Sequence, residues 1–438
     1  MYRGRRIRYA SPKKTEERTV MGGVQVKSEI GPLKQVLMHR PGEETQQYPH
    51  GDFLQVFYLR PAHTEFDLAK AQAEHDRLTT LLSDEGVEVL HVQDLLVEAI
   101  DSTEQARTEL TEAYVKDGRI EGIELMEGVK EHLAKAITSE QFVKRLFEGV
   151  RYGDIDLLAS DRQSLATLTG SSFDADTFLI NPINAAFFTR DPMSVVGKGI
   201  TLNHMYWQDR NQEVNVLEAV ARHHPRFASA PSWFDHRCSF HLEGGDLVNL
   251  DAHTLAVGLS SRTEAAAIDV LARRLLWEAD ESEITSIYAF DVPQIGNRLH
   301  LDTCISRIDY DTFVVDPALA QNPTVFKMSR GRKEGSVSIK ELSGDLRSMF
   351  KQALDIGPIR LMDLDSGASN RIEFERDNGA TSMLCLAPGN LCVCEENVTA
   401  NNLLDKAGMT LHPVSIQEMT AGFGGPTSLC LPLWRENV

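Results

Sequence analysis

The sequence is poor in cysteine, in long hydrophobic runs and in positive charge. Six cysteines among 438 residues are too few and too irregular for a disulfide framework, show no zinc-binding spacing and suit a reducing cytoplasm, the location that we predict. No apolar run approaches the roughly 20 residues of a membrane span. The 64 acidic residues outnumber the 45 Lys and Arg residues, which argues against nucleic acid or an anionic membrane as partner. A small polar substrate remains possible.

What is present indicates a globular protein with an ample core, because 42% of the residues are hydrophobic. Residues 1–23 are basic and contain no apolar segment of a secretory signal, so we expect a disordered tail. Residues 24–94 are typical of a β-α-β unit, with strands at 34–39 and 87–92 around an amphipathic helix at 66–82. Residues 95–170 are charged and helical, and they predict a helical subdomain inserted into the α/β domain.

Strands return in residues 171–438, where strand pairs alternate with single helices. Expected strands include 186–188, 194–196 and 299–308, and a hairpin is expected across 247–258. The alternation indicates repeated α/β modules, although no sequence period is evident. The predicted catalytic domain therefore combines 24–94 with 171–438.

Three short segments place acids or a histidine in apolar sequence: 188–192, 241–246 and 299–303. Buried acids and histidines are rare without partners, so the three segments predict either a structural polar cluster or one active site. Asp191 and Asp302 could hold a planar cation such as guanidinium through paired charge-assisted hydrogen bonds. Glu243 and His300 could exchange protons, because a carboxylate fixes the tautomer of an imidazole and raises its pKa.

Two arginines near predicted helix starts, Arg210 and Arg262, could bind a carboxylate of the substrate. A single arginine more often belongs to a surface ion pair. Each of these motifs, taken alone, is more often a satisfied structural polar group than a functional one.

Together the motifs carry a resemblance to the arginine deiminases of the guanidino-group-modifying superfamily, over most of the chain outside the N-terminal tail. The resemblance implies a five-fold pseudosymmetric α/β propeller, the pentein fold, with the helical subdomain of 95–170 inserted. The matching segments are 28–37, 71–76, 188–192, 201–203 with Arg210, 243–246, 261–263, 300–303, 387–389 and 424–426.

The family mechanism then implies a role for each residue. Asp191 and Asp302 hold the guanidinium group, and Glu243 and His300 handle protons. Arg210 and Arg262 bind the α-carboxylate of arginine. A cysteine thiolate attacks the guanidino carbon, ammonia leaves, and water hydrolyses the covalent amidino intermediate to citrulline, without a metal or an organic cofactor. A homo-oligomer is implied by analogy.

The nucleophile is where the sequence departs from the family. Ser428, native or introduced, stands at the position of the family's cysteine, and Cys430 follows two residues later. A hydroxyl needs strong activation to attack a resonance-stabilised guanidinium, whereas a thiol is intrinsically nucleophilic. If this segment is a strand, Cys430 faces the same side as Ser428 but lies roughly 6 to 7 Å along it, so a bulge would be needed to bring it into place.

Residues at the positions that contact substrate in the family also differ in this sequence. Phe423 stands where the family has an arginine, Ala185 stands where it has a substrate-binding asparagine, and Asn184 is adjacent to that position. The family's Phe-Asp-Asp segment has no counterpart at 62–67.

Three functions therefore compete. The first, which we favour, is a hydrolase that converts arginine or a related guanidino amino acid to citrulline and ammonia, using Cys430 or Ser428. The second is a catalytically silent paralogue that binds arginine, citrulline or another subunit. The third is an amidinotransferase-like enzyme, which would also need a cysteine nucleophile.

Overall fold

The structure is a computed structural model that describes residues 23–45, 66–155, 174–296, 298–364, 370–420 and 424–438. Nearly all of the predicted N-terminal tail, most of the 62–67 segment and Phe423 lie outside these residues.

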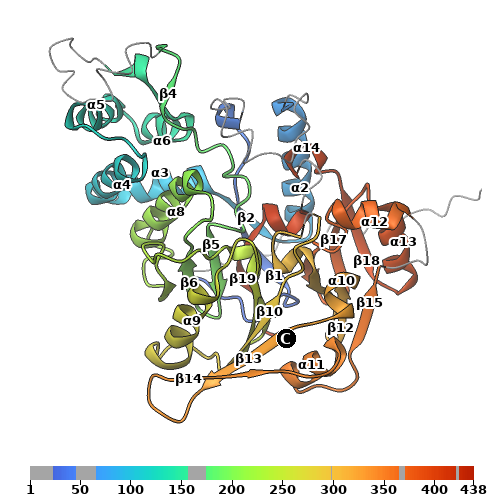
Figure 1. The fold of residues 1–438 in the computed structure, drawn as a ribbon. Coiled ribbons are helices and arrows are strands. Elements are labelled where there is room, and N and C mark those ends of the chain that lie inside the picture. The colour runs from blue at the N-terminus through green and yellow to red at the C-terminus, as the bar shows by residue number, and fades with distance from the viewer. Residues whose placement is uncertain (1–22, 46–65, 156–173, 297, 365–369, 421–423) are drawn as a thin grey trace, which may run out of the picture.

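Five sheets contain the same three-stranded unit, and one of these sheets has two further strands (Figure 1). In each unit the middle strand pairs antiparallel with one neighbour and parallel with the other. The predicted α/β fold class is confirmed, and its repeated modules number five among the described residues. The sheets are β19 (Leu431–Arg435), β1 (Leu33–Met38) and β2 (Glu88–His91); β5 (Met193–Val196), β6 (Gly199–Leu202) and β7 (Ser232–Phe234); β8 (Leu247–Asp251), β9 (Thr254–Leu259) and β10 (Ser286–Asp291); β11 (Ile305–Arg307), β12 (Thr312–Val315) and β15 (Arg360–Asp363); and β16 (Leu384–Ala387), β17 (Asn390–Cys394) and β18 (Thr410–Val414).

A helix links the two parallel strands of every module, because parallel neighbours cannot be joined by a tight turn. Pairing of β1 with β19 joins the first described strand to the last and so completes the fifth sheet. An extra hairpin extends β10. The linking helices are α2 (Leu68–Asp84), α8 (Asn211–His223), α9 (Ala265–Arg273), α11 (Leu346–Leu354) and α13 (Val398–Lys406). The extra hairpin consists of β13 (Val325–Arg330) and β14 (Val337–Glu341). Three further short helices are α10 (Pro317–Gln321), α12 (Asn370–Asp377) and α14 (Gln417–Thr420).

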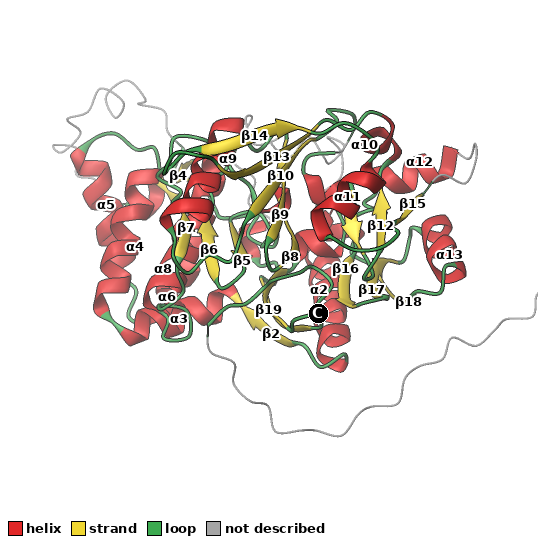
Figure 2. Ribbon diagram, turned by 90° about the horizontal axis from the view of Figure 1, so that it is seen from below, coloured by secondary structure: helices red, strands yellow, loops and turns green. Residues whose placement is uncertain are grey.

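Four helices group at one side of the molecule, next to α8 (Figures 1 and 2). They are α3 (Val92–Ser102), α4 (Glu104–Asp117), α5 (Ile123–Ala134) and α6 (Ser139–Glu148), followed by the small sheet of β3 (Val150–Arg151) and β4 (Phe178–Ile180). Their apolar faces share one hydrophobic cluster with α8, β5 and β6. The whole of 211–221 in α8 is buried for this reason.

Two expected strands are wrong in ways that bear on the site. Residues 186–188 form turns, and only 305–307 of the expected 299–308 strand pairs in a sheet. Residues 301–303 form a single 3-10 turn instead. In both places the polar segment occupies the turn before a strand. Among the described residues no helix is both long and apolar enough to cross a membrane.

Candidate active site

The polar segments occupy equivalent places in four modules. Each precedes the first strand of its module: 188–192 leads into β5, 243–246 into β8, 300–303 into β11 and 426–429 into β19. The repeated topology therefore brings segments that are far apart in sequence to the same end of the sheets. This explains how motifs with no common sequence can form one site.

The centre of the site is a pair formed by His300 and Glu243. The Nε2 atom of His300 lies 2.7 Å from Oε2 of Glu243, and both side chains are buried. Burial disfavours the charged imidazole, but the carboxylates of Asp191 and Glu243 outweigh it and raise the pKa of His300 to about 10. Burial also opposes the charge of Glu243, yet the hydrogen bond from His300 and nearby positive charges hold its pKa at about 2. At neutral pH the pair is an imidazolium and a carboxylate.

Asp191 lies on the other side of the imidazole. Its Oδ1 atom is 3.9 Å from Nδ1 of His300, and its Oδ2 atom accepts a hydrogen bond of 3.0 Å from Nη1 of Arg210. The backbone oxygen of Asp191 accepts hydrogen bonds from Asn203 Nδ2 at 2.7 Å and from the Gly244 amide at 2.9 Å. These bonds fix the 188–192 turn against the 243–246 turn.

Asp302 and Asp246 complete a group of four buried carboxylates. Burial raises the pKa of Asp302 to about 7 and that of Asp246 to about 6. Asp246 is satisfied, because it accepts hydrogen bonds from Ser260 Oγ at 2.6 Å and the Leu301 amide at 2.8 Å. By contrast, Oδ1 of Asp302 is buried without a hydrogen-bond partner among the described residues. An unpaired buried acceptor is costly unless a ligand satisfies it.

Two glycines allow the turns to meet. A Cβ atom on Gly245 would lie 2.7 Å from Cγ of His300, and one on Gly244 would lie 2.0 Å from the backbone oxygen of Arg190. The Gly-Gly pair is therefore required for the 243–246 turn to approach His300 and the Arg190 backbone this closely.

The two predicted carboxylate-binding arginines differ in their surroundings. The guanidinium of Arg210 donates hydrogen bonds to both carboxylate oxygens of Glu213, each at 2.9 Å. It also donates one of 3.0 Å to Asp191. Arg262 has one carboxylate at ion-pair distance among the described residues, Oε1 of Glu243 at 3.8 Å. Asn184 is buried, and its Nδ2 atom has no partner among the described residues.

The segment of Ser428 and Cys430 packs against the site, but it is not the strand that we expected. Ser428 lies in a 3-10 turn, residues 426–429, and only at Leu431 does β19 begin. The Ser428 backbone oxygen accepts a 3.4 Å hydrogen bond from the Arg190 amide, and the Leu429 oxygen accepts one of 3.1 Å from Thr189 Oγ1. The turn thus lies directly against the segment that carries Asp191.

Cys430 lies in a different environment from Ser428. It is fully buried in a hydrophobic cluster that contains Cys392 and Leu429, and burial raises the pKa of its thiol to about 12. A catalytic cysteine needs a lowered pKa and access to its substrate, so both properties count against Cys430 as the nucleophile.

Sequence reasoning missed three residues that shape this site. Glu213 holds Arg210, the Tyr206 amide donates to Oε1 of Glu243 at 3.0 Å, and Thr263 Oγ1 accepts from the Glu243 amide at 3.1 Å. The spacing of Arg210 and Glu213, three residues apart, could have indicated the ion pair.

Asp191, Glu243 and His300 each offer a possible metal ligand atom, and these atoms lie within 4.8 Å of one another. A metal ion and a proton would compete for the imidazole of His300, because a metal ligand must be deprotonated.

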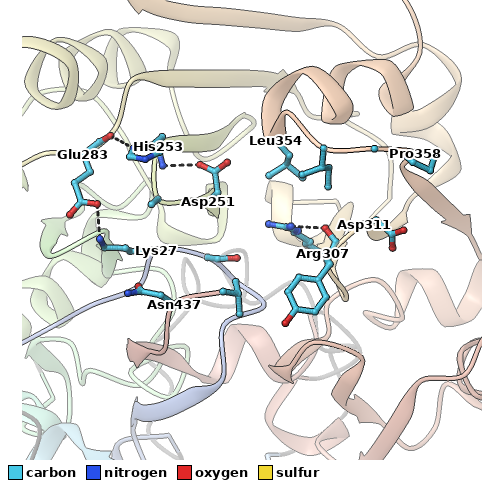
Figure 3. Close-up of a pocket in the computed structure, with 15 residues that line it drawn as sticks. Lys27, Asp251, His253, Glu283, Arg307, Asp311, Leu354, Pro358 and Asn437 are labelled. Atoms are coloured by element: carbon cyan, nitrogen blue, oxygen red, sulfur yellow. Dashed lines mark hydrogen bonds and ion pairs between the residues drawn. The ribbon is translucent and has the colours of Figure 1, made fainter.

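A separate cavity of about 690 Å³ lies where β8 and β11 end, so it is at the opposite ends of strands that begin at the site (Figure 3). Asp251 and Arg307 mark those strand ends, and Lys27 pairs with Glu283 at its edge at 2.6 Å. None of the predicted site residues lines it.

The chain has a five-module α/β fold with a buried group of carboxylates and a histidine, and solved structures share this fold. SxtG, an amidinotransferase from Microseira wollei, is 14% identical with a TM-score of 0.52 and covers 95% of this chain and 98% of its own. The N-terminal domain of ArgZ, an arginine dihydrolase from Cyanobacteria, is 12% identical with a TM-score of 0.50 and covers 92% of this chain and 97% of its own.

The arginine deiminase profile matches residues 64–435. Arginine deiminases from Treponema denticola and Clostridium perfringens are 32% and 33% identical, each match covering 95% of this chain and 100% or 98% of the relative. The chain belongs to the arginine deiminase family, which confirms the resemblance drawn from its motifs.

Proposed function

We propose that the protein is a guanidino-group hydrolase that converts arginine, or a related guanidino amino acid, to citrulline and ammonia. The observation that carries this proposal is the buried group of Asp191, Glu243, His300 and Asp302, in which one carboxylate oxygen has no partner. The unpaired oxygen of Asp302, together with Asp191, could accept hydrogen bonds from a guanidinium. The family relationship supports the same class of substrate.

The proton chemistry follows from the charge states. The His300 imidazolium gives a proton to the guanidino nitrogen as the bond from carbon to nitrogen breaks, and ammonia leaves. The neutral imidazole, still paired with Glu243, then takes a proton from water as water attacks the amidino carbon. This second step breaks the bond to the nucleophile, releases citrulline and restores the imidazolium.

Ser428 is the proposed nucleophile, because Cys430 is enclosed in the hydrophobic cluster. The bond from Ser428 Oγ to the guanidino carbon would form as its hydroxyl proton passes to a neighbouring carboxylate. When water later breaks that bond, this carboxyl group returns the proton to Oγ, and the protonated citrulline loses its extra proton to solvent. A hydroxyl is much harder to ionise than a thiol, so we expect slow turnover.

The second candidate is a silent arginine-binding paralogue. The serine at position 428, together with the buried thiol of Cys430, favours it directly, since no activated thiol is present in this segment. In that case the carboxylate group would serve for binding alone.

Turnover of L-arginine by the unmodified protein tests the choice. Equal amounts of citrulline and ammonia, accumulating in proportion to enzyme concentration, are the expected result. Binding in a calorimeter without product would favour the silent paralogue, and product that depends on an added amine would favour an amidinotransferase. A Glu243→Gln variant prepared in the same way is the control for contaminating activity.

A further inference from the structure

The cavity where β8 and β11 end is lined by charges of both signs that form no ion pair with each other (Figure 3). We propose that this cavity is a second ligand site, which binds a zwitterionic α-amino acid with an apolar side chain. Arg307 receives the carboxylate of this ligand, and Asp251 and Asp311 receive its ammonium group. The inference goes beyond the proposed function, because the cavity shares no residue with the carboxylate and histidine group.

Arg307 is a buried cation at the end of β11 that lacks a counter-charge. Its Nη1 atom donates to the backbone oxygen of Leu250, and its Nη2 atom donates to that of Tyr310 at 2.6 Å. Both acceptors are neutral, and no carboxylate of the described residues lies at ion-pair distance. Burial lowers the pKa of the guanidinium, and attraction to Asp251 offsets only part of this effect. An anion in the cavity would therefore stabilise Arg307.

Two aspartates that line the cavity lack a cationic partner. Oδ1 of Asp251 accepts a hydrogen bond of 2.7 Å from the amide of His253, and Oδ1 of Asp311 accepts one of 2.9 Å from the hydroxyl of Thr312. Among the described residues neither carboxylate forms an ion pair, and neither Oδ2 atom accepts a hydrogen bond. Each Oδ2 atom is thus available to an ammonium group.

The balance of charges selects a zwitterion. Lys27 and Glu283 also line the cavity, but they already pair with each other at 2.6 Å. The charges left without a partner are the guanidinium of Arg307 and the two aspartate carboxylates. A simple anion would be repelled by the carboxylates, and a simple cation would be repelled by the guanidinium. A ligand that carries both a carboxylate and an ammonium group matches both.

An apolar wall completes the cavity. Leu354 and Pro358 lie on the side opposite Glu283 in Figure 3, and Ala252 and Ile356 also line the cavity. A volume of about 690 Å³ is within the usual range for small-molecule sites. The hydrocarbon side chain of an amino acid could pack against this wall, which gives the ligand a third point of contact.

The cavity is far enough from the candidate active site to be filled independently. β8 starts directly after the 243–246 turn and ends at Asp251, and β11 starts after the 300–303 turn and ends at Arg307. The two places are therefore at opposite ends of the same two strands. A ligand in the cavity would not overlap a ligand at His300.

Titration calorimetry with L-norvaline tests the assignment. Pentanoate, which lacks the ammonium group, and butylamine, which lacks the carboxylate, are the matched compounds, and none of the three contains a guanidino group. The unmodified protein should bind norvaline with a Kd of about 1 mM, and about 10-fold or more tightly than either matched compound, the range for one charge-assisted contact.

A double variant, Asp251→Asn with Asp311→Asn, removes both negative charges and keeps the acceptors for the His253 amide and the Thr312 hydroxyl. It should bind norvaline about 10-fold more weakly and L-arginine as well as the unmodified protein does. Arg262→Gln is the control, because it changes an arginine that the family resemblance assigns to the carboxylate of arginine. Norvaline affinity should be unchanged in this control.

Arg307→Gln should weaken norvaline and pentanoate but not butylamine. Arg307 also links Leu250 to Tyr310, so far-ultraviolet circular dichroism checks the fold of this variant. If it does not fold, the aspartate double variant decides alone.

Three results would overturn the proposal. They are no saturable binding of norvaline, equal affinity for norvaline and one of the matched compounds, and norvaline binding that is lost in Arg262→Gln but kept in the aspartate double variant. None of these results concerns binding or turnover of L-arginine, so failure of this inference is distinguishable from failure of the proposed function.

Discussion

The carboxylate and histidine group and the turn that carries Ser428 lie side by side but differ in chemical completeness. In the first region His300 and Glu243 are paired in charged states, and one oxygen of Asp302 has no partner among the described residues. In the second region the accessible position carries a hydroxyl, and the nearby thiol of Cys430 is enclosed in the core with a raised pKa.

The difference suggests that the acid and base residues can be separated from the nucleophile position in this fold, because the former lie in the turns of three modules and the latter in the turn of a fourth. The 426–429 turn contacts the segment of Asp191 through the backbone oxygens of Ser428 and Leu429. We therefore expect a side-chain replacement at position 428 to leave the acid and base residues in place.

The largest expected effect comes from removing a charge from the carboxylate and histidine group. In a Ser428→Cys background, Glu243→Gln should lower kcat for arginine by about 10²- to 10⁴-fold, the usual contribution of general acid and base catalysis. The amide keeps the shape of the carboxylate but removes the negative charge that is hydrogen-bonded to Nε2 of His300. Steady-state release of ammonia measures the effect. A decrease of less than twofold would show that the pair does not take part in proton transfer.

A smaller effect should appear in the pH dependence of binding. The carboxyl group of Asp302 has a pKa raised to about 7, so it is largely protonated below that pH in the free protein. Guanidinium binds the carboxylate form, and arginine affinity should therefore rise as pH increases from about 5.5 to 8, by up to about tenfold per pH unit below the pKa. Titration calorimetry across this range measures the slope.

Asp302→Asn is the control for this dependence, because it cannot ionise. Its affinity for arginine should be lower and its pH slope flatter than those of the native protein. A slope that is unchanged in the variant would assign the titration to another group.

The smallest functional effect is expected at Cys430. Cys430→Ala removes a buried sulfur and should lower the free energy of unfolding by about 1 kcal/mol, because a small cavity forms. Turnover by the folded variant should equal that of the parent. Chemical denaturation measures the free energy of unfolding, and the ammonia assay measures turnover. A loss of turnover without a loss of stability would indicate that Cys430 is the nucleophile.

Much of this comparison was predictable from sequence. Acids and a histidine in apolar sequence need partners, which points to Asp191, Glu243, His300 and Asp302, and the structure brings together the three turns that carry them. The helix of 66–82 was also predicted to within two residues at each end, since its apolar stripe and Gly86 are local signals. The fivefold repetition was not visible as a period, because the modules share strand pairing and not side chains.

The errors have local causes. The segments 186–188 and 299–308 are apolar, and apolarity alone does not distinguish a strand from a buried turn. The same ambiguity affected 426–430, where the 3-10 turn places Ser428 and Cys430 in different surroundings. The ion pair of Arg210 with Glu213 is indicated by their spacing of three residues, whereas the contact of Arg210 with Asp191 depends on the packing of two modules.

We propose that this protein retains the acid, base and guanidinium-binding residues of a guanidino-group hydrolase, and that Ser428, in place of a thiol, limits its rate. The measurement that tests it most directly is the rate of citrulline formation from L-arginine by Ser428→Cys beside the unmodified protein. We predict an increase of about 10³-fold or more, since removing a covalent nucleophile costs as much as about 10⁶ in kcat elsewhere. No increase, in a folded variant that still binds arginine, would contradict the claim.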